Sequence, residues 1–287
     1  MTIVIATDHE KSPGGDVSSS ASMPWINLLG VRVSAVDMTS AVRFVVDAIA
    51  AGERSYICVR DVHGIVRCQS DLALREAHNR AFLVTPDGMP LVWSLKLSGH
   101  RSARRVYGPD LMLALFDRGR QHGLRHFLFG TTPEVLAQLE SRLAAAFPGV
   151  SFVGSHAPPF RELSTGEEEQ IVGELNRARP DIVWVGLGTP KQELWMARMR
   201  DRLEAPMLIG VDAAFDFHAG VRRQAPRFIQ RSGFEWLFRL ACEPRRLWRR
   251  YAVAVPSFLG LAMLQALGLR DFRIDTPPRT DAPAGGA

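Results

Sequence analysis

The sequence has few cysteines, and their spacing excludes the usual cysteine-based sites. Cys58, Cys68 and Cys242 are the only three, and no two of them form a CxxC pair. An odd number of cysteines without metal-ligand spacing argues against a disulfide framework and against a zinc centre. The N-terminal segment also lacks a basic start followed by an apolar core of signal-peptide length. We therefore expect reduced thiols, no metal and a cytoplasmic protein.

Lysine is also scarce, so the positive charge of the chain is almost entirely arginine. Only Lys11, Lys96 and Lys191 are lysines among 35 basic residues, and the net charge is +5. The planar arginine side chain binds phosphate through two parallel hydrogen bonds, which lysine cannot do. With 46% hydrophobic and 23% charged residues, the composition is that of a soluble globular protein and argues against a disordered or polytopic membrane protein.

The sequence contains one long uncharged run, of 19 residues at 251–269. This length is close to the ~20 residues that span a bilayer, but a proline, two glycines and a glutamine weaken a spanning helix. The preceding segment, 221–251, holds nine arginines against only Glu235 and Glu243. Arginines before an apolar run are typical of a segment that docks on anionic lipid. We prefer membrane docking to spanning and, because no nucleic-acid module is evident, expect no nucleic-acid partner.

Strand-like and helix-like segments alternate through most of the chain, which predicts an α/β fold. Apolar, β-branched strands joined by helical crossovers form a mostly parallel sheet with helices on both faces. The chain divides into a disordered leader (1–24), an α/β catalytic domain (25–220), an arginine-rich and apolar helical appendage (221–270) and a disordered tail (271–287). The expected strands are 26–36, 55–61, 125–130, 150–155, 181–188 and 206–211, and the expected helices are 38–51, 133–147, 167–178 and 190–203.

Four polar segments follow predicted strands. Asp61 ends one strand, the segment 85–88 follows a strand-like apolar run at 81–84, and the segments 186–189 and 212–216 come at the ends of two more strands. In open parallel sheets, ligands bind beyond the carboxyl ends of the strands. We therefore expect these four segments to converge on one edge of the sheet.

Asp87 is the strongest single candidate for catalysis, because prolines at 86 and 90 flank it closely. An isolated Asp-Gly more often stabilises its own turn, but the prolines favour a carboxylate aimed at a substrate. Such a carboxylate serves as a general base when the leaving group is stabilised. Arg105, 18 residues downstream, is a cation that could do this, although it could equally be a surface arginine like Arg101 and Arg104.

The segment GLGTPKQELW (186–195) is the second candidate. Gly186 and Gly188 follow a strand and precede a helix, so backbone N–H groups and the helix dipole are available to an anion. The alternative is a plain tight turn, and the spacing is neither a Walker A loop nor GxGxxG. Lys191, Gln192 and Glu193 add polar groups in the first turn, although they could equally form a solvated helix start. Downstream, Asp212 and Asp216 could bind a cation or sugar hydroxyls, and we favour a metal-free site.

Taken together, several stretches resemble the WecG/TagA/CpsF family of glycosyltransferases. The resemblance runs in family order over about residues 26–260. The stretches are TPDGMPLVW, RRVYGPDL, LFGTTPEVL, FPGV, PDIVWVGLGTPKQELWMARM, FDFHAG with RQAPRF, and GFEWLFRLACEPRRLWRRY.

The resemblance implies a Rossmann-like enzyme that transfers a sugar from a UDP-sugar to a polyprenyl-diphosphate-linked saccharide. Transfer would invert the anomeric centre without a metal or other cofactor. Asp87 would be the catalytic base, Arg105 an active-site arginine, and Gln192 and Asp216 donor contacts. The appendage would both reach the inner face of the membrane and complete the site. Its arginines, placed near the departing UDP, are Arg245, Arg246, Arg249 and Arg250.

Two departures from the family pattern leave the transferred sugar open. Val59 and Asp61 stand where the family often has a Thr-x-Asn pair, and Asp212 stands where it often has glycine. N-acetylmannosamine, its uronic acid, glucuronic acid and glucose remain candidates, with Asp61 arguing weakly against an anionic sugar. These departures also motivate a second hypothesis, a catalytically silent nucleotide-sugar-binding scaffold of a polysaccharide assembly complex. A monomer on a membrane and a homo-oligomer that buries the apolar run are both compatible with the sequence.

Overall fold

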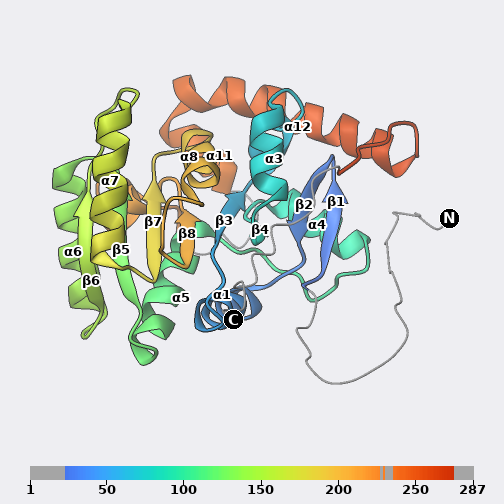
Figure 1. Ribbon diagram of the computed structural model, residues 1–287. Coiled ribbons are helices and arrows are strands. Elements are labelled where there is room, and N and C mark those ends of the chain that lie inside the picture. Colours follow the sequence, from blue (N-terminus) through green and yellow to red (C-terminus); the bar gives the residue numbers. More distant parts are fainter. Residues whose placement is uncertain (1–22, 227–228, 230–234, 275–287) are drawn as a thin grey trace, which may run out of the picture.

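The computed structural model describes residues 23–226, 229 and 235–274, and its centre is a six-stranded parallel sheet (Figure 1). The predicted α/β class with a mostly parallel sheet is confirmed. The strand order is β4-β3-β8-β7-β5-β6, and every neighbouring pair is parallel. The strands are β3 (Ser55–Arg60), β4 (Leu83–Pro86), β5 (Arg125–Gly130), β6 (Ser151–His156), β7 (Ile182–Gly186) and β8 (Met207–Gly210).

Helices cover both faces of the sheet, because each parallel connection must cross over it. One hydrophobic cluster holds the inner faces of α1 (Met38–Ala50), α5 (Gly108–Gln121), α6 (Pro133–Ala146) and α9 (Ala214–His218). The other cluster holds those of α2 (Val62–Arg67), α3 (Leu72–Asn79), α4 (Met89–Leu97), α7 (Thr165–Ala178) and α8 (Lys191–Met199). The central strands are buried on both sides, which explains their continuous apolar sequences.

The segment predicted as one strand over 26–36 is instead an antiparallel hairpin. Strands β1 (Trp25–Leu28) and β2 (Val31–Ser34) are joined by a turn in which Leu29 and Gly30 have φ of 55° and 79°. The turn has a local signal that the prediction did not use, because the Asn27 side-chain oxygen accepts a hydrogen bond from the Gly30 N–H at 2.9 Å. The hairpin packs beside edge strand β4, where the Ser34 hydroxyl accepts a hydrogen bond from the Val84 N–H at 3.1 Å. It thereby covers an otherwise open sheet edge.

The C-terminal region forms two helices, α11 (Glu235–Cys242) and α12 (Pro244–Ala266), which are labelled in Figure 1. Helix α12 packs against α2. Phe258, on α12, belongs to the hydrophobic cluster that also holds the inner faces of α2 and α8. The Gln265 side chain accepts from the Leu29 N–H and donates to the Asn27 carbonyl, both at 3.0 Å. The predicted appendage is therefore joined to the domain by core contacts. Among the described helices, none is long and apolar enough to cross a membrane.

The disordered tail predicted from residue 271 is wrong at its beginning. Phe272 is buried and belongs to the core cluster, and its carbonyl accepts from the Asn27 side chain at 2.5 Å. Phe272 directly follows Arg270 and Asp271 in the sequence, so its neighbours do not indicate a buried segment. The rest of the predicted tail, 275–287, and the predicted leader up to residue 22 lie outside the described residues.

Candidate active site

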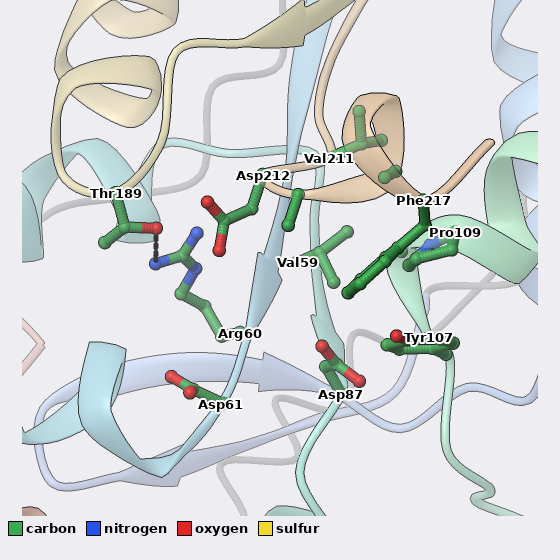
Figure 2. A pocket seen from close by; sticks show the side chains of 13 residues that line it. Val59, Arg60, Asp61, Asp87, Tyr107, Pro109, Thr189, Val211, Asp212 and Phe217 are labelled. Carbon is green, nitrogen blue, oxygen red and sulfur yellow. Dashed lines mark hydrogen bonds between the residues drawn. The ribbon is translucent and has the colours of Figure 1, made fainter. Parts of the chain in front are cut away.

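A pocket lies at the carboxyl edge of the sheet, where β3, β4, β7 and β8 end (Figure 2). The four polar segments predicted to converge there each contribute to it, through Asp61, Asp87, Thr189 and Asp212. The remaining lining comes from β3, the start of α5 and the turn into α9. It consists of Val59, Arg60, Tyr107, Gly108, Pro109, Val211, Ala213, Ala214 and Phe217.

Asp87 is fixed at the end of β4 by its own backbone and by Arg105. The Asp87 N–H donates to the Arg60 carbonyl at 2.8 Å, which continues the β3–β4 ladder by one residue. The Arg105 guanidinium donates to Oδ1 of Asp87 from Nη2 at 2.8 Å and from Nε at 3.0 Å, and Nε also donates to the Asp87 carbonyl. Both side-chain bonds go to Oδ1. No described residue donates to Oδ2, so this oxygen is available to a substrate hydroxyl.

Arg105 is shared between two carboxylates that are far apart in sequence. Oε2 of Glu235, the first residue of α11, lies 2.7 Å from Nη2 of Arg105. The guanidinium also stacks on Tyr107, with its carbon 4.3 Å from the ring centroid. The predicted appendage therefore contacts Arg105 through a glutamate, whereas contact of its arginines with a leaving group stays a prediction.

The surroundings of Asp87 raise the pKa of its carboxyl to about 6. Burial is the largest cause, since it disfavours the charged form. Arg105 opposes this effect, while the negative charges of Glu235 and Asp61 add to it. A carboxylate with a pKa near 6 is ionised at neutral pH and still accepts a proton more readily than an ordinary aspartate. This combination suits a general base.

A buried ion pair closes the inner side of the pocket. The Arg60 and Glu193 side chains are 2% and 0% exposed and form a direct hydrogen bond. Arg60 Nη1 also donates to the Thr189 hydroxyl at 3.1 Å, as Figure 2 shows. Burial raises the pKa of Glu193 even though Arg60 opposes it. The pair ties the end of β3 to α8 and to the loop before it.

Gln192, predicted to contact the sugar donor, instead links the Arg60–Glu193 pair to Asp212, just after β8. Its side chain is fully buried, donates to Oε1 of Glu193 at 2.7 Å and accepts from the Asp212 N–H at 3.0 Å. Both ends of the amide are therefore occupied within the protein. Gln192 is not among the residues that line the pocket, so any effect on a ligand passes through Asp212 or through the Arg60–Glu193 pair.

The predicted anion loop between β7 and α8 is shaped by its glycines. A Cβ on Gly186 would lie 2.7 Å from the Phe215 ring, so no larger residue fits, and Gly188 has φ of 75°. The Thr189–Pro190 peptide is cis. The loop places Thr189 in the pocket, whereas Lys191 is exposed at the start of α8. Anion binding by Gly186, Gly188 and Lys191 stays a prediction.

Two predicted acidic contacts differ in position. Asp61 lines the pocket, but Oδ1 also accepts from the Gly64 N–H at 2.9 Å and so caps α2. Asp216 lies on α9 outside the pocket lining, and its Oδ2 is 3.1 Å from Nε of Arg222. The structure therefore supports a pocket position for Asp61 and a paired position for Asp216.

The arginines predicted to meet the leaving group are at the start of α12. Arg245 and Arg249 are exposed, and the Arg249 guanidinium carbon lies 5.4 Å from the Trp248 ring centroid. The side chains of Arg246 and Arg250 lie outside what the structure describes. Their contact with a leaving group stays a prediction.

Sequence reasoning missed Arg60 and Glu235 as parts of the site, and it took Glu193 only as a polar residue in the first turn of a helix. Arg60 ends the apolar strand SYICVR, and a charge at the end of a buried strand requires a partner. That signal could have pointed to Glu193, in the first turn of α8, the helix that follows β7, two positions along the sheet from β3. Glu235 had a weaker signal, as one of two acids in an arginine-rich segment. Within the described chain, no three His, Cys, Asp or Glu side chains are placed to hold a metal ion.

The parallel sheet and the carboxylate-lined pocket at its carboxyl edge define a Rossmann-like α/β enzyme with a candidate acid–base residue, Asp87. The family described as "Glycosyl transferase WecG/TagA/CpsF family" matches residues 26–271, and the chain belongs to this family. It is therefore a glycosyltransferase. A relative from Bacillus spizizenii is N-acetylglucosaminyldiphosphoundecaprenol N-acetyl-beta-D-mannosaminyltransferase. It is 30% identical over 179 residues, which cover 62% of this chain and 67% of the relative.

Proposed function

We propose that this glycosyltransferase moves a sugar from a UDP-sugar to a saccharide carried on a polyprenyl diphosphate, with inversion and without a metal. The transferred sugar belongs to the set N-acetylmannosamine, its uronate, glucuronate and glucose. The relative's name, with a mannosaminyl group and an undecaprenyl-diphosphate-linked acceptor, supports the acceptor class. The observation that carries the chemistry is Asp87, held by Arg105 in a pocket that raises its pKa to about 6.

In this proposal Asp87 is the general base of a single displacement. Oδ2 accepts the proton of the acceptor hydroxyl, while Arg105 holds Oδ1. The acceptor oxygen forms a bond to the anomeric carbon as the bond from that carbon to the β-phosphate oxygen of UDP breaks. UDP leaves with the electron pair, and the proton remains on Asp87 until it passes to solvent. One displacement on one face of the sugar inverts the anomeric configuration.

The departing diphosphate needs positive charge, and the pocket itself offers none that is free among the described residues. Arg60 is paired with Glu193, and Arg105 is paired with Asp87 and Glu235. We assign the leaving-group role to the four arginines at the start of α12, which guanidinium groups fulfil without a metal. Gly186, Gly188 and Lys191 border the same edge and are the proposed backbone and side-chain contacts of the donor. Gln192 would position Asp212, and Asp216 would act from outside the pocket lining.

The outer face of α12 supports peripheral binding to the inner face of the cytoplasmic membrane, where a polyprenyl-linked acceptor resides. Apolar side chains on this face are exposed to solvent, and Arg245 and Arg249 stand at its start. Cationic and apolar groups together bind the interface of an anionic bilayer. The function would then lie in exopolysaccharide or other cell-envelope polysaccharide synthesis. The exposed apolar side chains are Trp248, Val253, Val255, Leu259 and Met263.

The test is a transfer assay with a panel of UDP-sugars and a short-chain prenyl diphosphate bearing N-acetylglucosamine. The expected result is one disaccharide product whose anomeric configuration, read by NMR coupling constants, is opposite to that of the donor. The same rate with and without EDTA is expected. Retention of configuration would exclude the single displacement, loss of activity in EDTA would exclude metal independence, and transfer from none of the UDP-sugars would exclude the donor class.

A further inference from the structure

The Asp212 carboxylate differs from the other carboxylates that line the pocket, because its charge acts on Arg60 without a hydrogen bond or close ion pair. Oδ1 of Asp87 is held by Arg105, and Oδ1 of Asp61 caps α2. Within the described residues, the Asp212 carboxylate makes no hydrogen bond or ion pair; only its backbone N–H is engaged, with Gln192. Figure 2 shows the carboxylate turned toward Arg60 across the pocket.

The backbone conformation at Asp212 is one that favours glycine over a residue with a side chain. Its φ of 49° lies in the left-handed region, which glycine adopts freely and other residues adopt at a cost. Aspartate tolerates this region better than most residues, yet glycine would fit the turn without strain. The fold therefore does not require a side chain here. What aspartate adds at this position is a carboxylate in the pocket.

The charges around the pocket determine which ligands the carboxylate favours. Five carboxylates, those of Asp61, Asp87, Glu193, Asp212 and Glu235, stand against two guanidinium groups, those of Arg60 and Arg105. Arg60 cannot serve a bound anion, because its side chain is 2% exposed and both terminal nitrogens already have partners. The pocket thus has an excess of negative charge and an oxygen that accepts hydrogen bonds.

We infer that Asp212 makes this pocket selective for uncharged sugars and against uronic acids. This inference rests on the proposed function and narrows its donor class. A neutral sugar donates a hydroxyl hydrogen bond to the Asp212 carboxylate. A uronate brings a second carboxylate to the same place, where it is repelled and finds no free cation among the described pocket residues. Asp212 is therefore a specificity-determining residue, and N-acetylmannosamine or glucose is the transferred sugar.

The test compares donors that differ only at carbon 6. UDP-N-acetylmannosamine and its uronate form one pair, and UDP-glucose and UDP-glucuronate form another. Dissociation constants by calorimetry and kcat/KM in the transfer assay are measured for wild type, Asp212→Asn and Asp212→Gly. The asparagine keeps the size of the side chain, and the glycine relaxes the backbone. Asp47→Asn is the control, because it removes the same charge from the exposed surface of α1.

Wild type is expected to prefer the neutral member of the pair it uses. Both Asp212 variants should reduce that preference about tenfold, or ~1.4 kcal/mol, while Asp47→Asn leaves it unchanged. The wild-type preference should also shrink as salt rises, because Asp212 is exposed and its charge is screened. A wild-type preference for the uronate, or equal preference in wild type and both variants, overturns the inference.

The binding measurement separates this inference from the proposed function. Selective binding that depends on Asp212, without transfer to any acceptor, would support the inference and overturn the proposed transfer. Transfer with a donor preference that ignores Asp212 would support the proposed function and overturn the inference. Failure of every UDP-sugar to bind would overturn both.

Discussion

Replacing Glu193 by glutamine removes one charge from the buried ion pair while keeping the shape of the side chain. Arg60 is then left inside the protein with an uncompensated charge, since its side chain is only 2% exposed. Breaking a buried pair in this way costs about 3–5 kcal/mol of unfolding free energy. For a chain of this size, that corresponds to a fall in Tm of about 6–20 °C. Chemical denaturation with urea measures the free energy directly.

Removing both charges should cost less than removing one. In the double variant Arg60→Met with Glu193→Leu, no buried charge remains, and apolar replacements of buried pairs are often near neutral. A residual cost of about 1–3 kcal/mol is expected, because Gln192 loses the carboxylate that accepts from its amide. The double variant should therefore be more stable than Glu193→Gln. This ordering is the signature of a charge penalty and would not arise from lost packing.

The exposed pair Arg80–Glu76 provides the matched control. Its side chains are 52% and 50% exposed, and the two residues are one helical turn apart. Glu76→Gln should change the unfolding free energy by less than about 0.5 kcal/mol, as exposed pairs usually do. The reasoning is refuted if Glu193→Gln costs no more than Glu76→Gln, or if the double variant is the less stable of the two.

Two further predictions concern the pH dependence and the membrane. The pH profile of kcat/KM should have an acid limb near pH 6, with activity rising as Asp87 loses its proton. Glu235→Gln should move this limb to lower pH, because the negative charge of Glu235 raises the pKa of Asp87. An unmoved limb would show that Glu235 does not affect the pKa of Asp87. Wild type should float with vesicles of phosphatidylglycerol and phosphatidylethanolamine, and the double variant Leu259→Glu with Met263→Glu should not. The control, Ala144→Glu with Ala145→Glu on the exposed face of α6, should float as wild type does. Equal flotation of both double variants would show that the outer face of α12 is not the membrane-binding surface.

The sequence predicts those parts of the fold where the local pattern of residues is compatible with one type of secondary structure. RHFLFG forms a strand over the predicted residues 125–130, because an apolar run of this length, ended by a glycine, is too short for a buried helix. The hairpin at 25–34 could not be separated in the same way. Its turn has only the short polar signal of Asn27 and Gly30, and the apolar residues on both sides continue the strand pattern across it.

The candidate site shows the same division between local and distant information. Asp87 is predictable, since its prolines and its place after a strand are local features. The partners that tune it are not, because Glu235 is 148 residues away from Asp87 in sequence and meets Arg105 only in the folded chain. Gln192 illustrates the opposite error. Its position suggests a ligand contact, yet both ends of its amide are used to join Glu193 to Asp212.

The most direct test of the central claim is single-turnover transfer by Asp87→Asn, with UDP affinity measured on the same preparation. If Asp87 is the base, the variant should bind UDP as wild type does and transfer sugar about 10²–10⁴-fold more slowly. The surface control Asp47→Asn should match wild type in both measurements. Transfer by Asp87→Asn at the wild-type rate would contradict the claim and remove Asp87 from the chemistry.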